Sequence, residues 1–122
     1  MKKSLISVAT IALSAILLTS CQMGPNTLSL SKTTFKPGEN IEVTYKTDST
    51  SSTAWIGVIP SATPHGTEEG NDAADVSYVY LNGVASGTKT MVAPSTTGSF
   101  DLRLNESDAG GKELASITFK VE

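Results

Sequence analysis

The chain has 122 residues, of which 39% are hydrophobic and 17% charged, and its formal net charge at neutral pH is −3. This length supports one domain with one core, and the acidic balance argues against nucleic acid as a partner, because nucleic-acid-binding proteins carry basic patches that neutralise phosphates. The single cysteine excludes a disulfide within the chain.

Residues 1–20 have the three-part layout of a cleaved export signal. Lys2 and Lys3 supply a positive start, and a mostly apolar stretch follows over residues 5–18. That stretch is shorter than the about 20 residues that a membrane-spanning helix needs. We therefore expect residues 1–20 to be a signal peptide and not part of the mature fold.

The end of this segment, Leu18-Thr19-Ser20-Cys21, resembles the bacterial lipobox, in which an aliphatic residue and two small residues precede an acylated cysteine. The resemblance implies a lipoprotein whose Cys21 carries fatty acids such as palmitate and anchors the chain to the cell envelope. Stable anchoring needs more than one acyl chain, since each buried CH₂ contributes only about 0.8 kcal/mol. In such lipoproteins an Asp directly after the cysteine is the usual retention signal, and here that position holds Gln22. The resemblance therefore implies sorting to the outer membrane if the organism has two membranes.

The mature chain would hold seven basic and twelve acidic side chains, a net charge of −5. This charge opposes adhesion to anionic lipid, so the acyl group at Cys21 must provide the contact with the membrane. We interpret residues 21–26, which include Gly24 and Pro25, as lipid anchor and tether. Residues 27–122 are expected to form the folded domain.

Seven segments of the domain have the composition of strands, and no segment convincingly predicts a helix. Most of them alternate apolar and polar residues with a period of two, which turns one side of each strand inward. Asn82-Gly83 predicts a hairpin between the fourth and fifth segments. We expect an all-β, antiparallel β-sandwich of about seven strands. The segments are residues 28–30, 41–45, 55–59, 76–81, 88–92, 100–104 and 117–121.

Several core and turn patterns resemble a recurrent bacterial immunoglobulin-like module over residues 28–121. The resemblance implies an immunoglobulin-like sandwich with a non-catalytic, accessory role. Trp55 opens the third strand, where such folds bury an indole against the core. The patterns include Phe35-Lys36-Pro37-Gly38-Glu39, Ala54-Trp55-Ile56-Gly57, Pro64-His65-Gly66 and Phe100-Asp101-Leu102-Arg103.

The long loop over residues 61–75 is the first candidate binding region. Loops of this length in a small domain are often functional. The immunoglobulin-like topology predicts that it leaves the sandwich at the end opposite to a second polar loop, residues 105–113. Its candidate binding residues are His65, Glu68, Glu69, Asp72 and Asp75.

The second loop is a candidate calcium site. Calcium takes 6–8 oxygen ligands, and carboxylates crowd here around two glycines. The same topology places this loop beside Asp48. A calcium ion would then be bound by Asp48, Glu106, Asp108 and Glu113. The alternative is a solvated acidic hairpin that binds no metal.

Catalysis is not predicted. Zinc needs three or four protein ligands, and His65 has neither a second histidine nor a free thiol to join it. No nucleophile-elbow pattern accompanies it, so we expect His65 to fix its loop by packing or a hydrogen bond. Tyr78 and Tyr80 share one face of a strand and would suit sugar binding if exposed, whereas Trp55 is expected in the core.

The sequence thus predicts an envelope-anchored lipoprotein that presents a non-catalytic immunoglobulin-like module to a protein or polysaccharide partner. The alternative is a structural or assembly subunit of a cell-envelope complex, because small sandwiches expose edge strands that pair with other chains. An enzyme is the third hypothesis.

Overall fold

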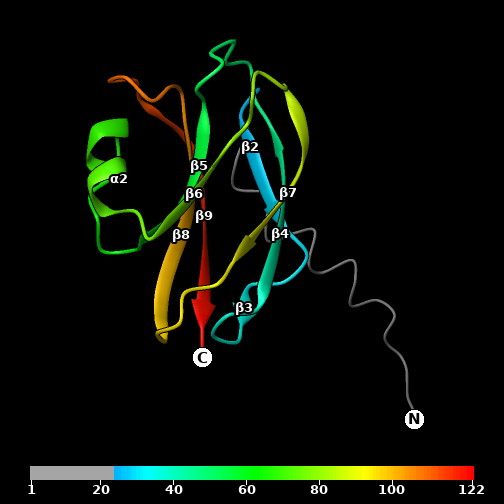
Figure 1. Ribbon diagram of the computed structural model, residues 1–122, viewed down its shortest axis with the longest axis vertical. Helices are drawn as coiled ribbons and strands as arrows, with labels where there is room; N and C mark the ends of the chain where they lie inside the picture. The colour runs from blue at the N-terminus through cyan, green and yellow to red at the C-terminus, as the bar shows by residue number, and fades with distance from the viewer. Residues whose placement is uncertain (1–23) are drawn as a thin grey trace.

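The computed structural model describes residues 24–122, and two β-sheets packed face to face enclose its core (Figure 1). The predicted signal peptide and Cys21 lie outside the described residues. No helix within residues 24–122 is long and apolar enough to cross a membrane.

The smaller sheet has three antiparallel strands in the order β2-β4-β7. They are β2 (Thr27–Leu30), β4 (Asn40–Lys46) and β7 (Ser86–Val92). Along β4, buried apolar residues alternate strictly with exposed polar ones, as the period of two predicted. This sheet therefore has one wet face and one face on the core.

The larger sheet has five strands in the order β3-β9-β8-β5-β6. Its pairings are antiparallel except for the short parallel pairing of β3 with β9. The strands are β3 (Thr34–Phe35), β9 (Glu113–Val121), β8 (Gly98–Asn105), β5 (Trp55–Pro60) and β6 (Ser77–Tyr80). The predicted all-β sandwich is confirmed, and within residues 24–122 the short β3 adds an eighth strand.

The core between the sheets is aliphatic and aromatic. The ring of Phe119 packs edge-on to Phe35, with centroids 5.6 Å apart, and stacks on Phe100 at 6.0 Å. Ile56 and Val58 reach this core from β5. Burial of such side chains, each contributing about 1.5–3 kcal/mol, is the main favourable term in folding.

Strand β5 is buried on both faces, and this determines where Trp55 lies. Ile56 and Val58 belong to the core, whereas the Trp55 ring lies over Gly57 on the opposite, outer face of the sheet. Trp55 is only 2% exposed, so its predicted burial is confirmed. It packs on the outer face and not in the main cluster between the sheets, because a second layer covers that face.

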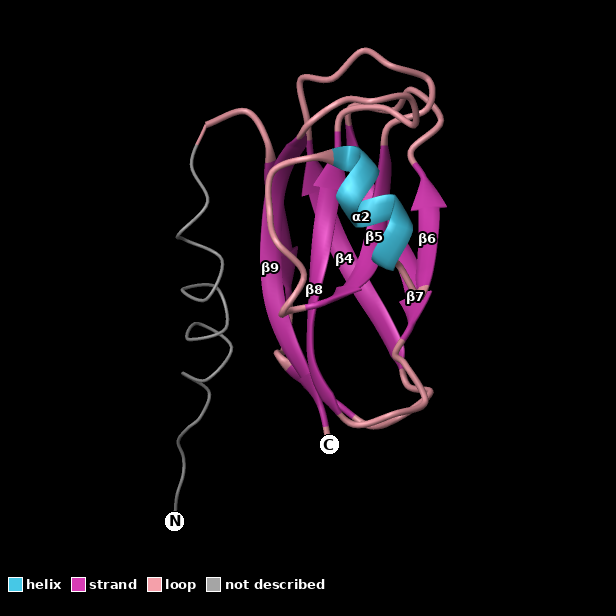
Figure 2. Cartoon of the chain, turned by 90° about the vertical axis from the view of Figure 1, so that its left-hand side faces the viewer, coloured by secondary structure: helices cyan, strands magenta, loops and turns pink. Residues whose placement is uncertain are grey.

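That second layer includes a helix, α2 (Glu68–Ala74), which crosses the outer face of the larger sheet (Figure 2). Thr67 caps it by accepting a hydrogen bond from the Gly70 amide at 3.1 Å. Seven residues are too few for a stable isolated helix, and tertiary contacts hold it in place. The expectation of a domain without a helix was wrong for this reason.

The predicted hairpin between β6 and β7 does not form. Strand β6 pairs with β5 in one sheet, and β7 pairs with β4 in the other. A turn does occur at Asn82 and Gly83, which both adopt positive φ angles of 57° and 77°. It redirects the chain from one sheet to the other, so β6 and β7 form an edge of their respective sheets.

Candidate functional site

The two polar loops meet on the outer face of the larger sheet. The Glu68 amide donates to the Gly111 carbonyl at 3.0 Å, and the Glu113 amide donates to the Gly66 carbonyl at 3.1 Å. The two loops leave opposite ends of the sandwich, as predicted, because Pro60 at the end of β5 pairs with Phe100, whereas Asn105 at the end of β8 pairs with Trp55. After β5 ends, the chain turns back along the outer face and reaches the β8–β9 loop.

The predicted position of the β8–β9 loop beside the segment that contains Asp48 is confirmed. The Ser49 hydroxyl donates to the Glu106 carbonyl at 2.9 Å, and the Asp108 amide donates to the Thr53 hydroxyl at 3.1 Å. Residues 105–113 therefore lie between the segment that contains Asp48 and the segment that contains α2.

A buried arginine on β8 joins the sheet to the loop over residues 61–75, which we call the covering loop. The Arg103 side chain is 0% exposed, and its Nε and Nη2 atoms donate to Asp101 Oδ2 at 3.0 and 2.7 Å. It also donates to the carbonyls of Thr63 and Pro64, at 2.7 and 3.2 Å. A charge so deep in a protein is stable only when it is paired and hydrogen-bonded, and here both conditions hold.

Asn71 of α2 continues this network. Its Oδ1 accepts from Arg103 Nη1 at 2.9 Å. Its Nδ2 donates to Asn105 Oδ1 at 2.7 Å and to Glu113 Oε1 at 3.1 Å. Asn71 is completely buried, so the helix is fixed to the sheet by polar contacts that no sequence pattern indicated.

His65 fixes its loop, as predicted. Its Nδ1 lies 2.7 Å from Glu113 Oε2, and its Nε2 lies 3.2 Å from Arg103 Nη2. Because a guanidinium can only donate, Nε2 accepts from Arg103 and Nδ1 carries the proton that Glu113 accepts. This contact and the bond to Asn71 use both carboxylate oxygens of Glu113 within the network.

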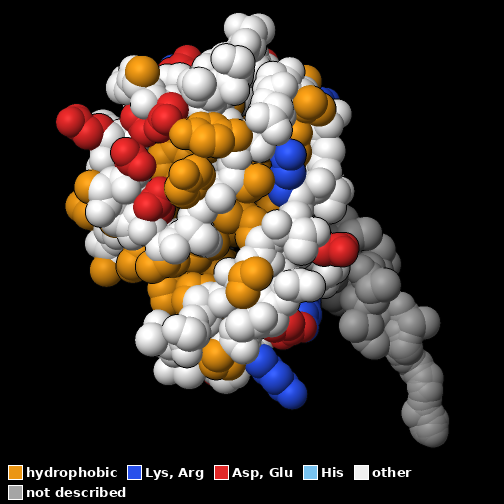
Figure 3. All heavy atoms as spheres, in the orientation of Figure 1, with side chains coloured by type: hydrophobic (Ala, Val, Ile, Leu, Met, Phe, Trp, Pro, Cys, Tyr) orange, Lys and Arg blue, Asp and Glu red, His pale blue; other side chains and the backbone are white. Residues whose placement is uncertain are grey.

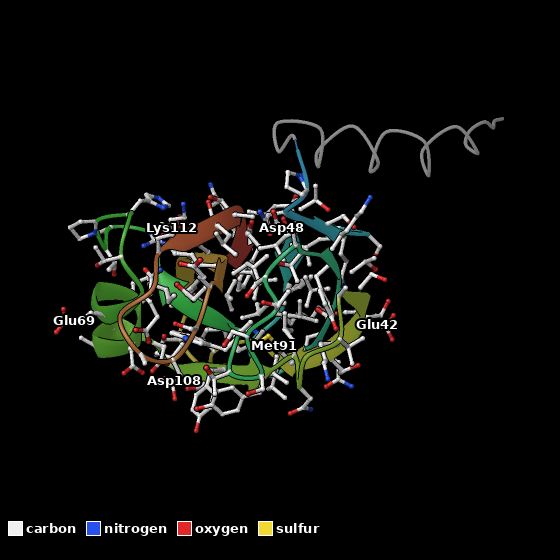
Figure 4. The ribbon with its side chains drawn as sticks, turned by 90° about the horizontal axis from the view of Figure 1, so that it is seen from above. Glu42, Asp48, Glu69, Met91, Asp108 and Lys112 are labelled. Atoms are coloured by element: carbon white, nitrogen blue, oxygen red, sulfur yellow. The ribbon has the colours of Figure 1, made fainter. Side chains whose placement is uncertain are left out.

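The four residues predicted for calcium are divided among three places. Asp48 and Glu106 line a shallow polar hollow with nearby serines. Glu113 belongs to the network of Arg103 and His65. Figure 4 shows Asp108 well apart from Asp48, on the side of the domain where the loop approaches α2.

Asp108 instead joins two carboxylates of α2. One carboxylate oxygen from each of Glu68, Asp72 and Asp108 lies within 4.8 Å of the other two. We call these three residues the acidic cluster. Burial, followed by the charges of Asp72, Asp108 and Glu68, raises the pKa of the neighbouring Asp75. The Glu69 side chain points away from the domain (Figure 4).

Tyr78 and Tyr80 of β6 form a surface beside the acidic cluster, which we call the aromatic surface. Tyr78 is 56% exposed, and its ring packs edge-on to Tyr80 at 5.4 Å and to the buried Trp55 at 6.2 Å. The Tyr80 hydroxyl donates to Asp108 Oδ2 at 2.7 Å, and this hydrogen bond is the main cause that raises the pKa of Tyr80 to about 12. Figure 3 shows acidic side chains gathered beside hydrophobic ones on this side of the molecule.

The aromatic surface is thus held from two directions. Trp55 supports it from below, and its Nε1 donates to the Ser107 carbonyl at 3.2 Å. Asp108, one residue further along the same loop, holds the hydroxyl of Tyr80. The tyrosines are therefore presented in a fixed geometry at the edge strand β6.

Comparison with known proteins does not assign the chain to a group: no family model matches it, and neither a curated protein nor a solved structure does.

Proposed function

We propose that this chain is an envelope lipoprotein, anchored through Cys21, whose immunoglobulin-like domain binds a polysaccharide without catalysis. The observation that carries the proposal is the exposed ring of Tyr78, held beside Tyr80 on a rigid sheet. Aromatic rings pack against the C–H faces of sugars, and fixed rings lose little conformational entropy on binding.

The surroundings of the aromatic surface suit sugar hydroxyl groups. Asp72 and Asp108 are exposed acceptors close to the rings, and carboxylates form strong hydrogen bonds to hydroxyl donors. The same charges would repel a polyanion. A neutral or amino-substituted polysaccharide is therefore the favoured ligand class.

The order of the strands supports the immunoglobulin-like part of the proposal. Strands β2, β4 and β7 follow the order A-B-E of that fold, and β9, β8, β5 and β6 follow the order G-F-C-C′. In this arrangement the aromatic surface lies on the edge strand C′. The outward direction of Trp55 is a departure from the antibody domains.

A structural or assembly role is the second candidate, and the edge position of β6 favours it. This strand ends the five-stranded sheet, and the adjacent Val76 is 56% exposed. An open edge with apolar side chains offers a template for strand addition by a partner protein. Such a partner would cover the same surface that we assign to the polysaccharide.

Tyr78→Ala tests the proposed function. The purified full-length protein is sedimented with insoluble cellulose, chitin and peptidoglycan, and the bound fraction is measured against concentration. We expect one of them to retain the protein and Tyr78→Ala to weaken that binding by about tenfold, equal to about 1.4 kcal/mol. Val92→Ala, an equally exposed change on the other sheet, should bind as the unchanged protein does. Equal binding by both variants would contradict the assignment of the surface.

Cys21→Ser tests the proposed anchor. Loss of the only thiol removes the only acceptor for the lipid, so the domain should move from the membrane fraction to the soluble fraction. Labelling with a palmitate analogue, followed by fractionation, measures both effects. A Ser variant that still incorporated the label would contradict the lipoprotein assignment.

A further inference from the structure

The acidic cluster combines carboxylates from two separate segments of the chain. Glu68 and Asp72 lie one turn apart on α2, and Asp108 comes from the β8–β9 loop. None of the ion pairs formed within residues 24–122 includes any of the three. Three negative charges thus converge with no described cation beside them.

A buried oxygen in the cluster lacks a partner. Glu68 is 3% exposed, and its Oε1 accepts from the Gly110 amide at 3.0 Å. Its Oε2 is buried and has no hydrogen-bond partner among the described residues. A buried acceptor without a partner costs about 1–3 kcal/mol, and more when the group is charged. A bound cation would supply the missing interaction.

We propose that the acidic cluster binds a calcium ion. Calcium lies 2.3–2.6 Å from its oxygen ligands, so two oxygens on one ion are separated by at most about 5 Å. The three oxygens of the cluster, all within 4.8 Å of one another, meet this condition as they stand. Three carboxylates leave some of the 6–8 ligand positions of calcium open, and water would fill them.

The donor chemistry selects calcium over other common metals. The cluster contains carboxylate oxygens only, which are hard ligands. Zinc favours nitrogen and sulfur, and the only histidine is bound to Glu113 and Arg103 instead. Magnesium demands a near-ideal octahedron, whereas calcium accepts irregular arrangements of several carboxylates.

Bound calcium would connect α2 to the β8–β9 loop. The helix and the loop already touch through the hydrogen bond from the Glu68 amide to the Gly111 carbonyl and through the one from the Gly110 amide to Glu68 Oε1. The ion would add a bridge from Glu68 and Asp72 to Asp108. It would also fix Asp108, which orients Tyr80. The site shares Asp72 and Asp108 with the surroundings of the proposed polysaccharide surface, but calcium binding is measured below without a polysaccharide, so the two proposals can fail separately.

The test is a thermal melt of the purified full-length protein in millimolar calcium and in EDTA. Extracellular calcium sites have dissociation constants on the order of 10⁻⁴–10⁻³ M, and saturation should raise the melting temperature by several degrees. Asp72→Asn should abolish most of this shift. Two controls should keep it: Glu69→Gln, on the same helix but pointing away, and Asp48→Asn, from the site predicted by sequence.

Terbium luminescence gives a second readout that does not depend on stability. Terbium(III) replaces calcium at oxygen sites and emits when an aromatic ring nearby is excited, and Tyr80 is hydrogen-bonded to Asp108. We expect emission that calcium displaces and that Asp72→Asn removes. Equal melts in calcium and EDTA without such emission would overturn the proposal. A shift that Asp48→Asn abolishes and Asp72→Asn leaves intact would overturn it as well.

Discussion

Arg103→Met should lower the free energy of unfolding by about 3–5 kcal/mol. Methionine keeps most of the side-chain volume but leaves Asp101, only 2% exposed, without its charged partner. The hydroxyl groups of Ser61 and Thr118 still donate to Asp101 Oδ1, but Oδ2 loses both bonds from the guanidinium. Urea unfolding followed by circular dichroism measures the loss.

The double variant Asp101→Asn, Arg103→Met is the matched control. Removal of both charges eliminates the uncompensated buried carboxylate, which is the main cause of the expected loss. The double variant should therefore be more stable than Arg103→Met alone. A loss below about 1 kcal/mol for Arg103→Met would show that the covering loop opens and lets water reach Asp101.

Trp55→Ala should be similarly destabilising, by about 3–5 kcal/mol, the range for loss of a large buried aromatic. Its ring lies over Gly57 so closely that a Cβ at that position would come within 2.5 Å of the indole. The substitution leaves a cavity under the β8–β9 loop and removes the hydrogen bond to the Ser107 carbonyl. Urea unfolding is again the measurement.

Trp55→Phe separates packing from hydrogen bonding. The phenyl ring keeps much of the apolar contact but cannot donate to Ser107, so its loss should be clearly smaller than that of alanine. A Trp55→Ala variant as stable as the unchanged protein would mean that the indole contributes no packing. The aromatic surface would then lack its support.

The alternation of residues predicted the core strands because burial of one face is a property of each strand by itself. It did not predict the second layer. Asp101, Arg103 and Asn105 have the spacing of a solvated face, yet all three are buried beneath the loop. A polar face covered by hydrogen-bonding groups and a polar face in water have the same sequence pattern. Only the path of residues 61–75 over the sheet shows which of these two faces β8 has.

The failed hairpin has a similar cause. Asn82-Gly83 does adopt the positive φ angles that the sequence signal implies. Local turn chemistry does not determine which sheet each flanking strand joins. Here the Leu81 amide bonds to Ala54 and the Thr47 amide bonds to Ala85, so the strands diverge.

The acidic cluster was predictable only in parts. Both carboxylate-rich loops were candidates for a binding site, but Glu68 and Asp108 are far apart in sequence. Their approach requires α2, a helix too short to give a periodic signal. Tyr78 and Tyr80 were predicted to share a face, but their exposure depends on the edge position of β6.

The most direct test of the proposed function is a map of backbone amide chemical shifts during titration with a soluble oligosaccharide of the retained polysaccharide. The changes should concentrate on Val76, Tyr78 and Tyr80 and extend to Asp108, whose carboxylate holds the Tyr80 hydroxyl. Saturable changes on the opposite sheet, around Val92, with β6 unaffected, would contradict the account.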